Sequence, residues 1–145
     1  MAEDYADSSF LISLNCADAN SKDALSYMAR HPVSLPFNPL HRLEVRNGFR
    51  LRVHRGDMTP EERTAALRQI DGDLAEGLLV HAPLPWTDAL RKAEQLSEEY
   101  TERTGSRAAD TLHVAVALLS KVRRFLSFDE KQRALAKVVG LTVKP

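Results

Sequence analysis

Short apolar segments alternate with longer amphipathic segments along this chain, and this alternation limits the available folds more than any other feature. The apolar segments have the length of strands, and several of them lack a polar residue at every second position, as expected of strands buried on both faces. Helices must then cover both faces of the sheet, and strands joined through helices run parallel. The sequence therefore predicts an α/β fold, namely a three-layer α/β/α sandwich with a central, mostly parallel sheet.

Proline, glycine and capping residues place the individual elements. The helix expected over residues 59–76 is the best marked, because Thr59 and Glu62 match a capping box and Gly77 follows the last turn. The other helices are expected at residues 10–14, 20–30, 40–55, 86–103, 107–120 and 130–140. Strands are expected at residues 5–7, within 31–39, and within 78–85, 123–129 and 141–145.

Length and composition set broad limits on the protein. A chain of 145 residues fits one domain over residues 1–145, and 20 acidic against 20 basic residues give no overall charge that favours or disfavours nucleic acid. Cys16 is the only cysteine, which excludes an intramolecular disulfide and fits a reducing compartment. The longest apolar run, residues 114–119, is too short to span a bilayer. We expect a soluble cytoplasmic protein that does not associate with membranes.

The helix expected at residues 107–120 carries a carboxylate where an apolar side chain would be ordinary. It is apolar nearly all round, yet Asp110 shares a stripe with His113, Val114 and Ala117 and therefore points inward. A favourable interaction with the helix dipole contributes only about 0.3–1 kcal/mol at an exposed site, whereas burying an unpaired carboxylate costs several times more. The inward position of Asp110 therefore indicates a partner for its charge.

Two further acids follow strand-like segments. Asp7 ends the first expected strand and Asp129 ends "RFLSF", so both carboxylates lie at one edge of the sheet if those strands are neighbours. Helix capping is the competing interpretation, because Asp7 precedes a helical turn and Asp129 is followed by Gln132 in a capping-box pattern.

Glu44 lies in the helix expected at residues 40–55. Leu40, Leu43 and Phe49 indicate that it borders the side facing the core. An intrahelical ion pair with a nearby arginine is the alternative.

Four stretches together resemble the ordered motifs of PIN-domain nucleases, especially VapC-type toxins: "YADSSFL", "HRLEVRNGFRLRV", "GSRAADTLHVAVAL" and "FLSFDEKQRALAKVVGL". This resemblance spans nearly the whole chain. It implies that the catalytic, metal-binding set is Asp7, Glu44, Asp110 and Asp129, and that Mg2+ or Mn2+ is the cofactor. Crowded carboxylates repel each other, and a hard divalent cation removes that repulsion.

The resemblance also implies an activity and partners. Similar proteins are endoribonucleases, so we expect an RNA substrate, a cognate antitoxin protein and a homodimer. Supporting roles are implied for Ser9, Asn47 and Ser127, whose hydroxyl and amide groups suit the orientation of carboxylates. Alternatives are an RNA-processing PIN nuclease without a toxin role, a non-catalytic PIN-like binding scaffold, and a phosphoacceptor receiver domain. The last lacks the expected Asp and Lys at the strand before "HAPLP".

Basic and imidazole side chains complete the candidate residues. Arg42, Arg46 and Arg50 recur every four residues, and we expect this stripe to contact RNA phosphates, although a solvated face or an antitoxin-binding surface explains it equally well. His113 is one turn from Asp110, but we interpret it as a packed, hydrogen-bonded histidine rather than a general base.

Overall fold

The structure is a computed structural model that describes residues 2–145, which fall into two compact units. The first, here called the terminal unit, holds residues 2–7 and 84–145. The second, the central unit, holds Ser8–Pro83. The prediction of a single domain over residues 1–145 stays a prediction.

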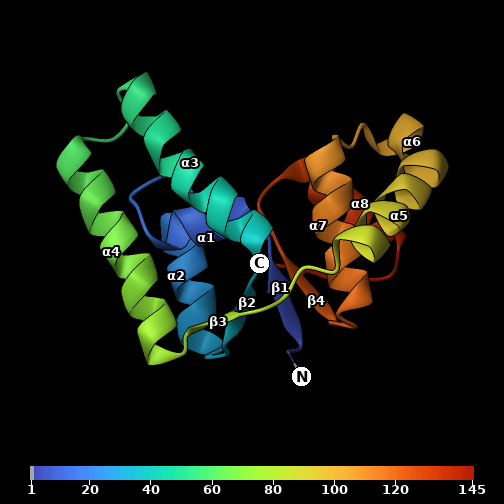
Figure 1. Cartoon of the computed structure of the whole chain (residues 1–145), viewed down its shortest axis with the longest axis horizontal. Coiled ribbons are helices and arrows are strands. Elements are labelled where there is room, and N and C mark those ends of the chain that lie inside the picture. Colours follow the sequence, from blue (N-terminus) through green and yellow to red (C-terminus); the bar gives the residue numbers. More distant parts are fainter. Residues whose placement is uncertain (1) are drawn as a thin grey trace. The chain divides into compact units, whose positions relative to one another are not determined.

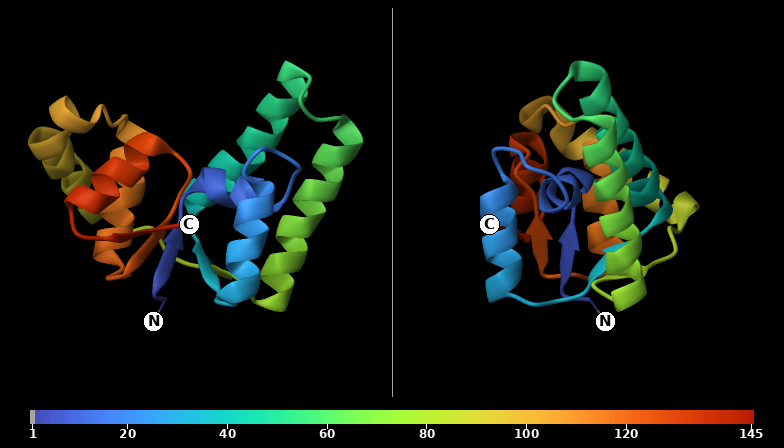
Figure 2. Two further views of the ribbon diagram at one scale, coloured as in Figure 1. Left: turned by 180° about the vertical axis from the view of Figure 1, so that it is seen from behind. Right: turned by 90° about the vertical axis from the view of Figure 1, so that its left-hand side faces the viewer.

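The terminal unit contains a parallel sheet of three short strands, β1 (Asp4–Ala6), β4 (Arg124–Leu126) and β5 (Thr142–Lys144), in the order β1-β4-β5. Asp4 lies opposite Arg124 in the register that joins β1 to β4. Figure 1 and the right-hand view of Figure 2 show β1 and β4 side by side and pointing the same way, although they are distant in the sequence. The strands that precede Asp7 and Asp129 are therefore neighbours, as the prediction that both acids lie at one edge of the sheet required.

The terminal unit also contains four α-helices: α5 (Trp86–Leu96), α6 (Glu102–Thr104), α7 (Ala108–Leu119) and α8 (Glu130–Val138). A π-helical turn, η1 (Ser97–Thr101), interrupts the helix expected over residues 86–103. α7 packs against both α5 and α8.

The stripe of α7 that carries Asp110 is buried, as its spacing predicted. The side chains of Asp110, His113, Val114 and Ala117 are all inaccessible to solvent or nearly so. Leu119 is 40% exposed, so the prediction of a helix buried nearly all round fails at its last turn. There the helix ends at the surface, with Ser120 exposed after it.

The central unit contains α1 (Ser8–Leu14), α2 (Ser21–Arg30), β2 (Leu35–Phe37), α3 (Pro39–Arg55), α4 (Pro60–Glu76) and β3 (Leu79–His81). β2 and β3 pair in parallel, while α3 packs against α1 and α4. α4 confirms its predicted boundaries: the Thr59 hydroxyl accepts from the Glu62 amide, the Glu62 carboxylate accepts from the Thr59 amide, and Gly77 has a φ of 78°.

The buried face of α3 differs from the prediction made from Leu40, Leu43 and Phe49. His41, Val45 and Phe49 face the core, at the four-residue spacing of one helical stripe, whereas Leu43 is 68% exposed. His41 is the first residue of this stripe. Its ring accepts a hydrogen bond from the backbone amide of Asn38, the N-cap residue of α3. The apolar pattern was therefore right for Phe49 and wrong for Leu43.

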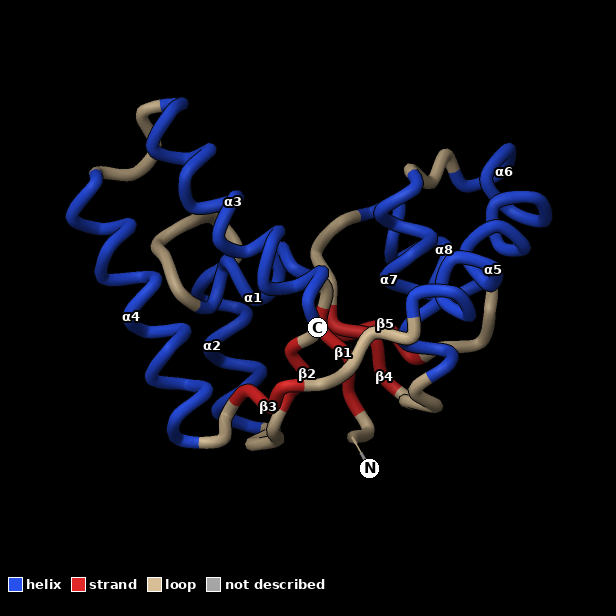
Figure 3. The backbone as a smooth tube through the Cα atoms, viewed as in Figure 1, coloured by secondary structure: helices blue, strands red, loops and turns tan. Residues whose placement is uncertain are grey.

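Helices outweigh strands in both units, and each strand pair that the structure describes is parallel (Figure 3). The α/β class expected from the sequence is confirmed, with the strands in separate ladders of three and two. No helix within residues 2–145 is long and apolar enough to cross a membrane.

Candidate active site

Asp7 and Asp129 follow neighbouring parallel strands of the terminal unit and are connected through Ser127. The Asp129 amide donates to the Ser127 hydroxyl over 3.0 Å, and this hydroxyl donates to the Asp7 carboxylate over 2.6 Å. Asp7 and Ser127 are both completely buried. These two hydrogen bonds, here called the Ser127 relay, hold the Asp7 carboxylate against the loop after β4. A short hydrogen bond to a charged acceptor is among the stronger ones in proteins.

Asp110 lies in the first turn of α7, and only 1% of its surface is exposed. Its Oδ2 accepts a hydrogen bond of 2.8 Å from the Arg107 amide and lies 3.4 Å from Arg107 Nε. The inward carboxylate thus has a charged partner three residues before it. Arg107 is therefore part of the charge partner that the inward position of Asp110 indicated. An exposed guanidinium offsets only some of the free energy that burial of the Asp110 carboxylate costs.

Arg107 also reaches the third acid of the terminal unit. Its terminal nitrogen is 3.5 Å from Asp129 Oδ2, so one guanidinium bridges Asp110 and Asp129. The other Asp129 oxygen accepts from the Gln132 amide, which confirms the capping interpretation of Asp129 without excluding a second role. Arg107 therefore links the side chains of Asp110 and Asp129, and Ser127 links the Asp7 carboxylate to the backbone amide of Asp129.

Glu44 belongs to the central unit, where it is half-buried on α3 and accepts a hydrogen bond of 2.9 Å from the Ser8 hydroxyl. Ser8 directly follows Asp7 in the chain. Ser9 and Asn47 are both exposed. Ser8 and Arg107 were not predicted as site residues. Their signals were the position of Ser8 beside Asp7 and the spacing of three residues between Arg107 and Asp110.

Two arginines of the α3 stripe, Arg42 and Arg50, are exposed, and Arg46 is half-buried. Arg42, Arg46 and Arg50 line a hollow of about 480 Å³ together with Pro39, Leu43 and Asn47. Arg46 forms an ion pair of 3.3 Å with Asp71, and Arg50 donates to the Arg46 carbonyl. The stripe therefore presents guanidinium groups to solvent beside an exposed leucine.

His113 is packed, as interpreted from the sequence. Its ring is 1% exposed, and its Nδ1 lies 2.7 Å from the Tyr5 hydroxyl. A second ring contact places the two side chains 5.8 Å apart between centroids. The histidine thus helps to hold β1 against α7.

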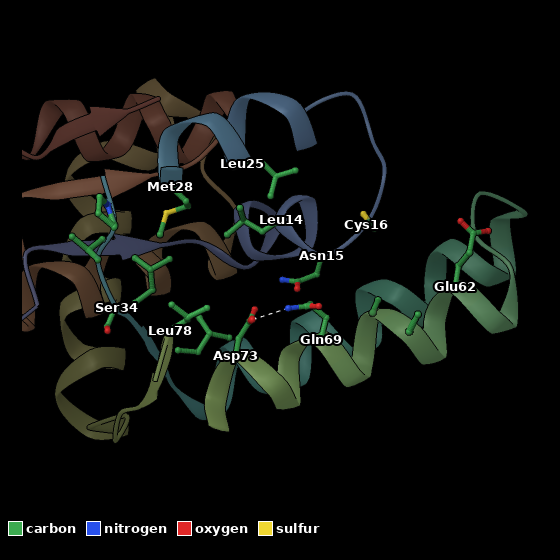
Figure 4. Close-up of a pocket in the computed structure, with 16 residues that line it drawn as sticks. Leu14, Asn15, Cys16, Leu25, Met28, Ser34, Glu62, Gln69, Asp73 and Leu78 are labelled. Carbon is green, nitrogen blue, oxygen red and sulfur yellow. Dashed lines mark hydrogen bonds between the residues drawn. The ribbon is translucent and has the colours of Figure 1, made fainter. Parts of the chain in front are cut away.

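A separate apolar cavity of about 890 Å³ lies in the central unit, and none of the predicted site residues lines it (Figure 4). On its lining, Gln69 donates to the Asp73 carboxylate over 2.9 Å, and burial raises the pKa of Asp73. Burial likewise raises the pKa of Cys16 to about 11. Cys16 is thus a poor nucleophile at neutral pH, as a structural cysteine should be.

The donor set of the terminal unit suits a hard divalent cation, since Asp7, Asp110 and Asp129 supply carboxylate oxygens and Ser127 a hydroxyl. Within residues 2–145, however, no group of three or more His, Cys, Asp or Glu side chains is placed so as to hold a metal ion. Two of the acids are instead engaged by Arg107. The chemistry of these oxygen donors nevertheless fits Mg2+ or Mn2+.

Comparison with known proteins defines the class to which this fold belongs. The chain resembles the Mycobacterium tuberculosis toxin VapC20, described as cleaving the sarcin-ricin loop, with 18% identity, a TM-score of 0.68 and coverage of 90% of this chain and 93% of that one. It also resembles VapBC2 of Rickettsia felis, solved with a promoter DNA fragment, with 11% identity, a TM-score of 0.66 and coverage of 97% and 96%.

A third similar structure is FitAcB of Neisseria gonorrhoeae, with 14% identity, a TM-score of 0.63 and coverage of 98% of this chain and 96% of that one. At these identities the likeness shows a shared fold. The family model named PIN domain matches residues 5–138, and the chain belongs to that family. No curated protein sequence matches it significantly. The receiver-domain alternative is therefore excluded.

Proposed function

We propose that this protein is a metal-dependent endoribonuclease that hydrolyses RNA phosphodiester bonds, and that it is the toxin of a toxin-antitoxin pair. The observation that carries the proposal is the group of three carboxylates in the terminal unit, linked by Ser127 and Arg107. Asp7 and Asp129 follow parallel strands at their carboxyl ends, where ligands bind in α/β folds. Membership of the PIN family supports the same activity.

Asp7, Asp110 and Asp129 would hold Mg2+ or Mn2+, and Ser127 would keep the Asp7 carboxylate oriented toward it. When bound, such an ion lowers the pKa of a water molecule enough for attack on phosphorus and neutralises charge on the leaving oxygen. The residues of the chain would supply oxygen ligands in a partly buried setting, where charge is poorly screened by solvent.

Glu44 is proposed as the fourth acid of the site. Its support is the family resemblance, together with the hydrogen bond from Ser8 that holds its carboxylate in place within the central unit. Ser9 and Asn47 keep their proposed supporting roles. Both residues lie at the surface of the central unit.

RNA is the proposed substrate, and Arg42, Arg46 and Arg50 are proposed to contact its phosphates, since guanidinium groups on one face suit a charged backbone. The VapBC2 and FitAcB relatives support an antitoxin protein as a partner. A homodimer and a cytoplasmic location complete the proposal. The homodimer follows from the family resemblance alone, and a single cysteine suits a reducing compartment such as the cytoplasm.

The test compares Asp110→Asn with a matched control, Asp88→Asn. Asp88 is an exposed acid in the first turn of α5, three residues after its N-cap, as Asp110 is in α7. Asn keeps the shape of the Asp110 side chain and an oxygen that can accept from the Arg107 amide, so the fold should survive. Purified proteins are incubated with end-labelled RNA in Mg2+, Mn2+ or EDTA, and melting curves are recorded in parallel.

We expect wild type and Asp88→Asn to cleave RNA with metal but not in EDTA, and Mg2+ to raise their melting temperatures. Asp110→Asn should cleave poorly and gain less stability from Mg2+, because its site has lost a charged ligand. Cleavage that persists in EDTA, or that is normal in Asp110→Asn, contradicts the proposal. RNA binding without cleavage by wild type supports the scaffold alternative instead.

A further inference from the structure

Arg107 is placed on the two acids in a way that its role as the N-cap residue of α7 does not require. The capping contact comes from its backbone amide, which donates to Asp110. The guanidinium adds contacts of 3.4 Å to Asp110 and 3.5 Å to Asp129, while 68% of the side chain remains exposed. It therefore covers the acids from the solvent side and has room to move away.

A single guanidinium satisfies both carboxylates because its nitrogens form a planar fork. One contact uses Nε and the other a terminal nitrogen, so the two acids share one positive charge. A divalent cation bound to the same two carboxylates would compete for their oxygens and repel the guanidinium. Both cations cannot hold these acids in the same arrangement.

We infer that Arg107 is a resident counter-cation that competes with the divalent metal for Asp110 and Asp129 and thereby sets the metal concentration at which the site loads. The inference rests on the proposed metal-dependent function. In the metal-free protein the guanidinium holds the two acids together. Metal binding displaces it toward solvent, where its charge faces an incoming phosphate backbone. Arg107 is thus a positioning residue that acts through the acids.

The experiment measures Mn2+ affinity directly by isothermal titration calorimetry of the full chain. Arg107→Gln removes the charge and leaves the backbone cap intact, and Arg107→Lys keeps the charge but loses the fork. Arg123→Gln is the control: it removes an identical charge from the same unit, at an exposed residue that precedes β4 and so lies at the opposite end of that strand from Asp129.

Removing the competing charge should tighten Mn2+ binding about tenfold in Arg107→Gln, which corresponds to about 1.4 kcal/mol. Arg107→Lys should have an intermediate Kd, and Arg123→Gln should remain within about twofold of wild type because its charge is remote and screened. In EDTA, Arg107→Gln should melt below wild type, since the acids lose their counter-ion. Saturating Mn2+ should close that gap.

A Kd for Arg107→Gln that equals or exceeds that of wild type overturns the inference, and so does an equal tightening in Arg123→Gln, which would indicate a general charge effect. These outcomes leave the proposed nuclease intact, because wild type still binds Mn2+. If wild type itself binds no Mn2+, the proposed function fails and this inference fails with it.

Discussion

Replacing Ser127 with alanine tests whether the relay between Asp129 and Asp7 holds the candidate site together. The hydroxyl is fully buried, donates to Asp7 over 2.6 Å and accepts from the Asp129 amide over 3.0 Å. Alanine fills nearly the same space, so a packing change contributes little. The change removes one donor from a buried carboxylate and one acceptor from a backbone amide.

The expected loss follows from the charge on Asp7. A hydrogen bond to a charged group contributes about 1.5–3 kcal/mol to stability, and the unmatched amide adds to the loss. We expect Ser127→Ala to lower the free energy of unfolding by about 2–3 kcal/mol. For a chain of this size that corresponds to a fall of roughly 4–12 °C in melting temperature.

Urea denaturation followed by circular dichroism measures this loss, with Ser120→Ala as the control. Ser120 is an exposed serine just after α7, and its replacement should change stability by less than about 0.5 kcal/mol. RNA cleavage by Ser127→Ala should also fall, because Asp7 loses a group that orients it. If Ser127→Ala is as stable as Ser120→Ala and as active as wild type, the relay has no role in holding Asp7.

Three further predictions concern the central unit. Because burial raises the pKa of Cys16 to about 11, its alkylation at pH 8 should be roughly ten- to a hundredfold slower than in urea, and a native rate equal to the unfolded rate would contradict this. Burial opposes ionisation of Asp18, yet the Asn20 amide, two serine hydroxyls and a nearby guanidinium lower its pKa. Asp18→Asn should therefore destabilise the protein at pH 7, and urea titrations should show this deficit starting to shrink below about pH 4, where the carboxylate of the unfolded chain takes up a proton, and vanishing only when the folded carboxylate is protonated as well; a deficit independent of pH would refute it. Charge reversal at Arg46 and Arg50 together should weaken RNA binding and flatten its salt dependence, whereas an unchanged slope in filter binding would remove the stripe from the RNA interface.

Local signals in the sequence predicted much of the fold. The boundaries of α4 follow from Thr59, Glu62 and Gly77, whose capping chemistry acts within one turn of the chain. The buried stripe of α7 follows from the spacing of Asp110 and His113. These features were predictable because neighbours in the sequence determine them.

Features that depend on distant residues or on long side chains were not predicted. The exposure of Leu43 reflects which face of α3 the rest of the central unit covers, and spacing alone does not contain that information. The spacing of apolar residues after α5 did not predict the π-helical turn at Ser97–Thr101. Arg107 contacts both Asp110 and Asp129 because a flexible side chain spans the gap between two helix starts, and only the fold brings those starts together.

The chemical ends of the RNA products test the central claim most directly. Hydrolysis by attack of water on phosphorus leaves a 5′-phosphate and a 3′-hydroxyl, and the RNA 2′-hydroxyl takes no part. RNA cleaved by the wild-type protein in Mg2+ should therefore be ligatable at its 5′ ends without kinase treatment and extendable at its 3′ ends without phosphatase treatment. Products that carry 2′,3′-cyclic phosphates would show that the 2′-hydroxyl is the nucleophile and would contradict a metal-dependent hydrolysis by Asp7, Glu44, Asp110 and Asp129.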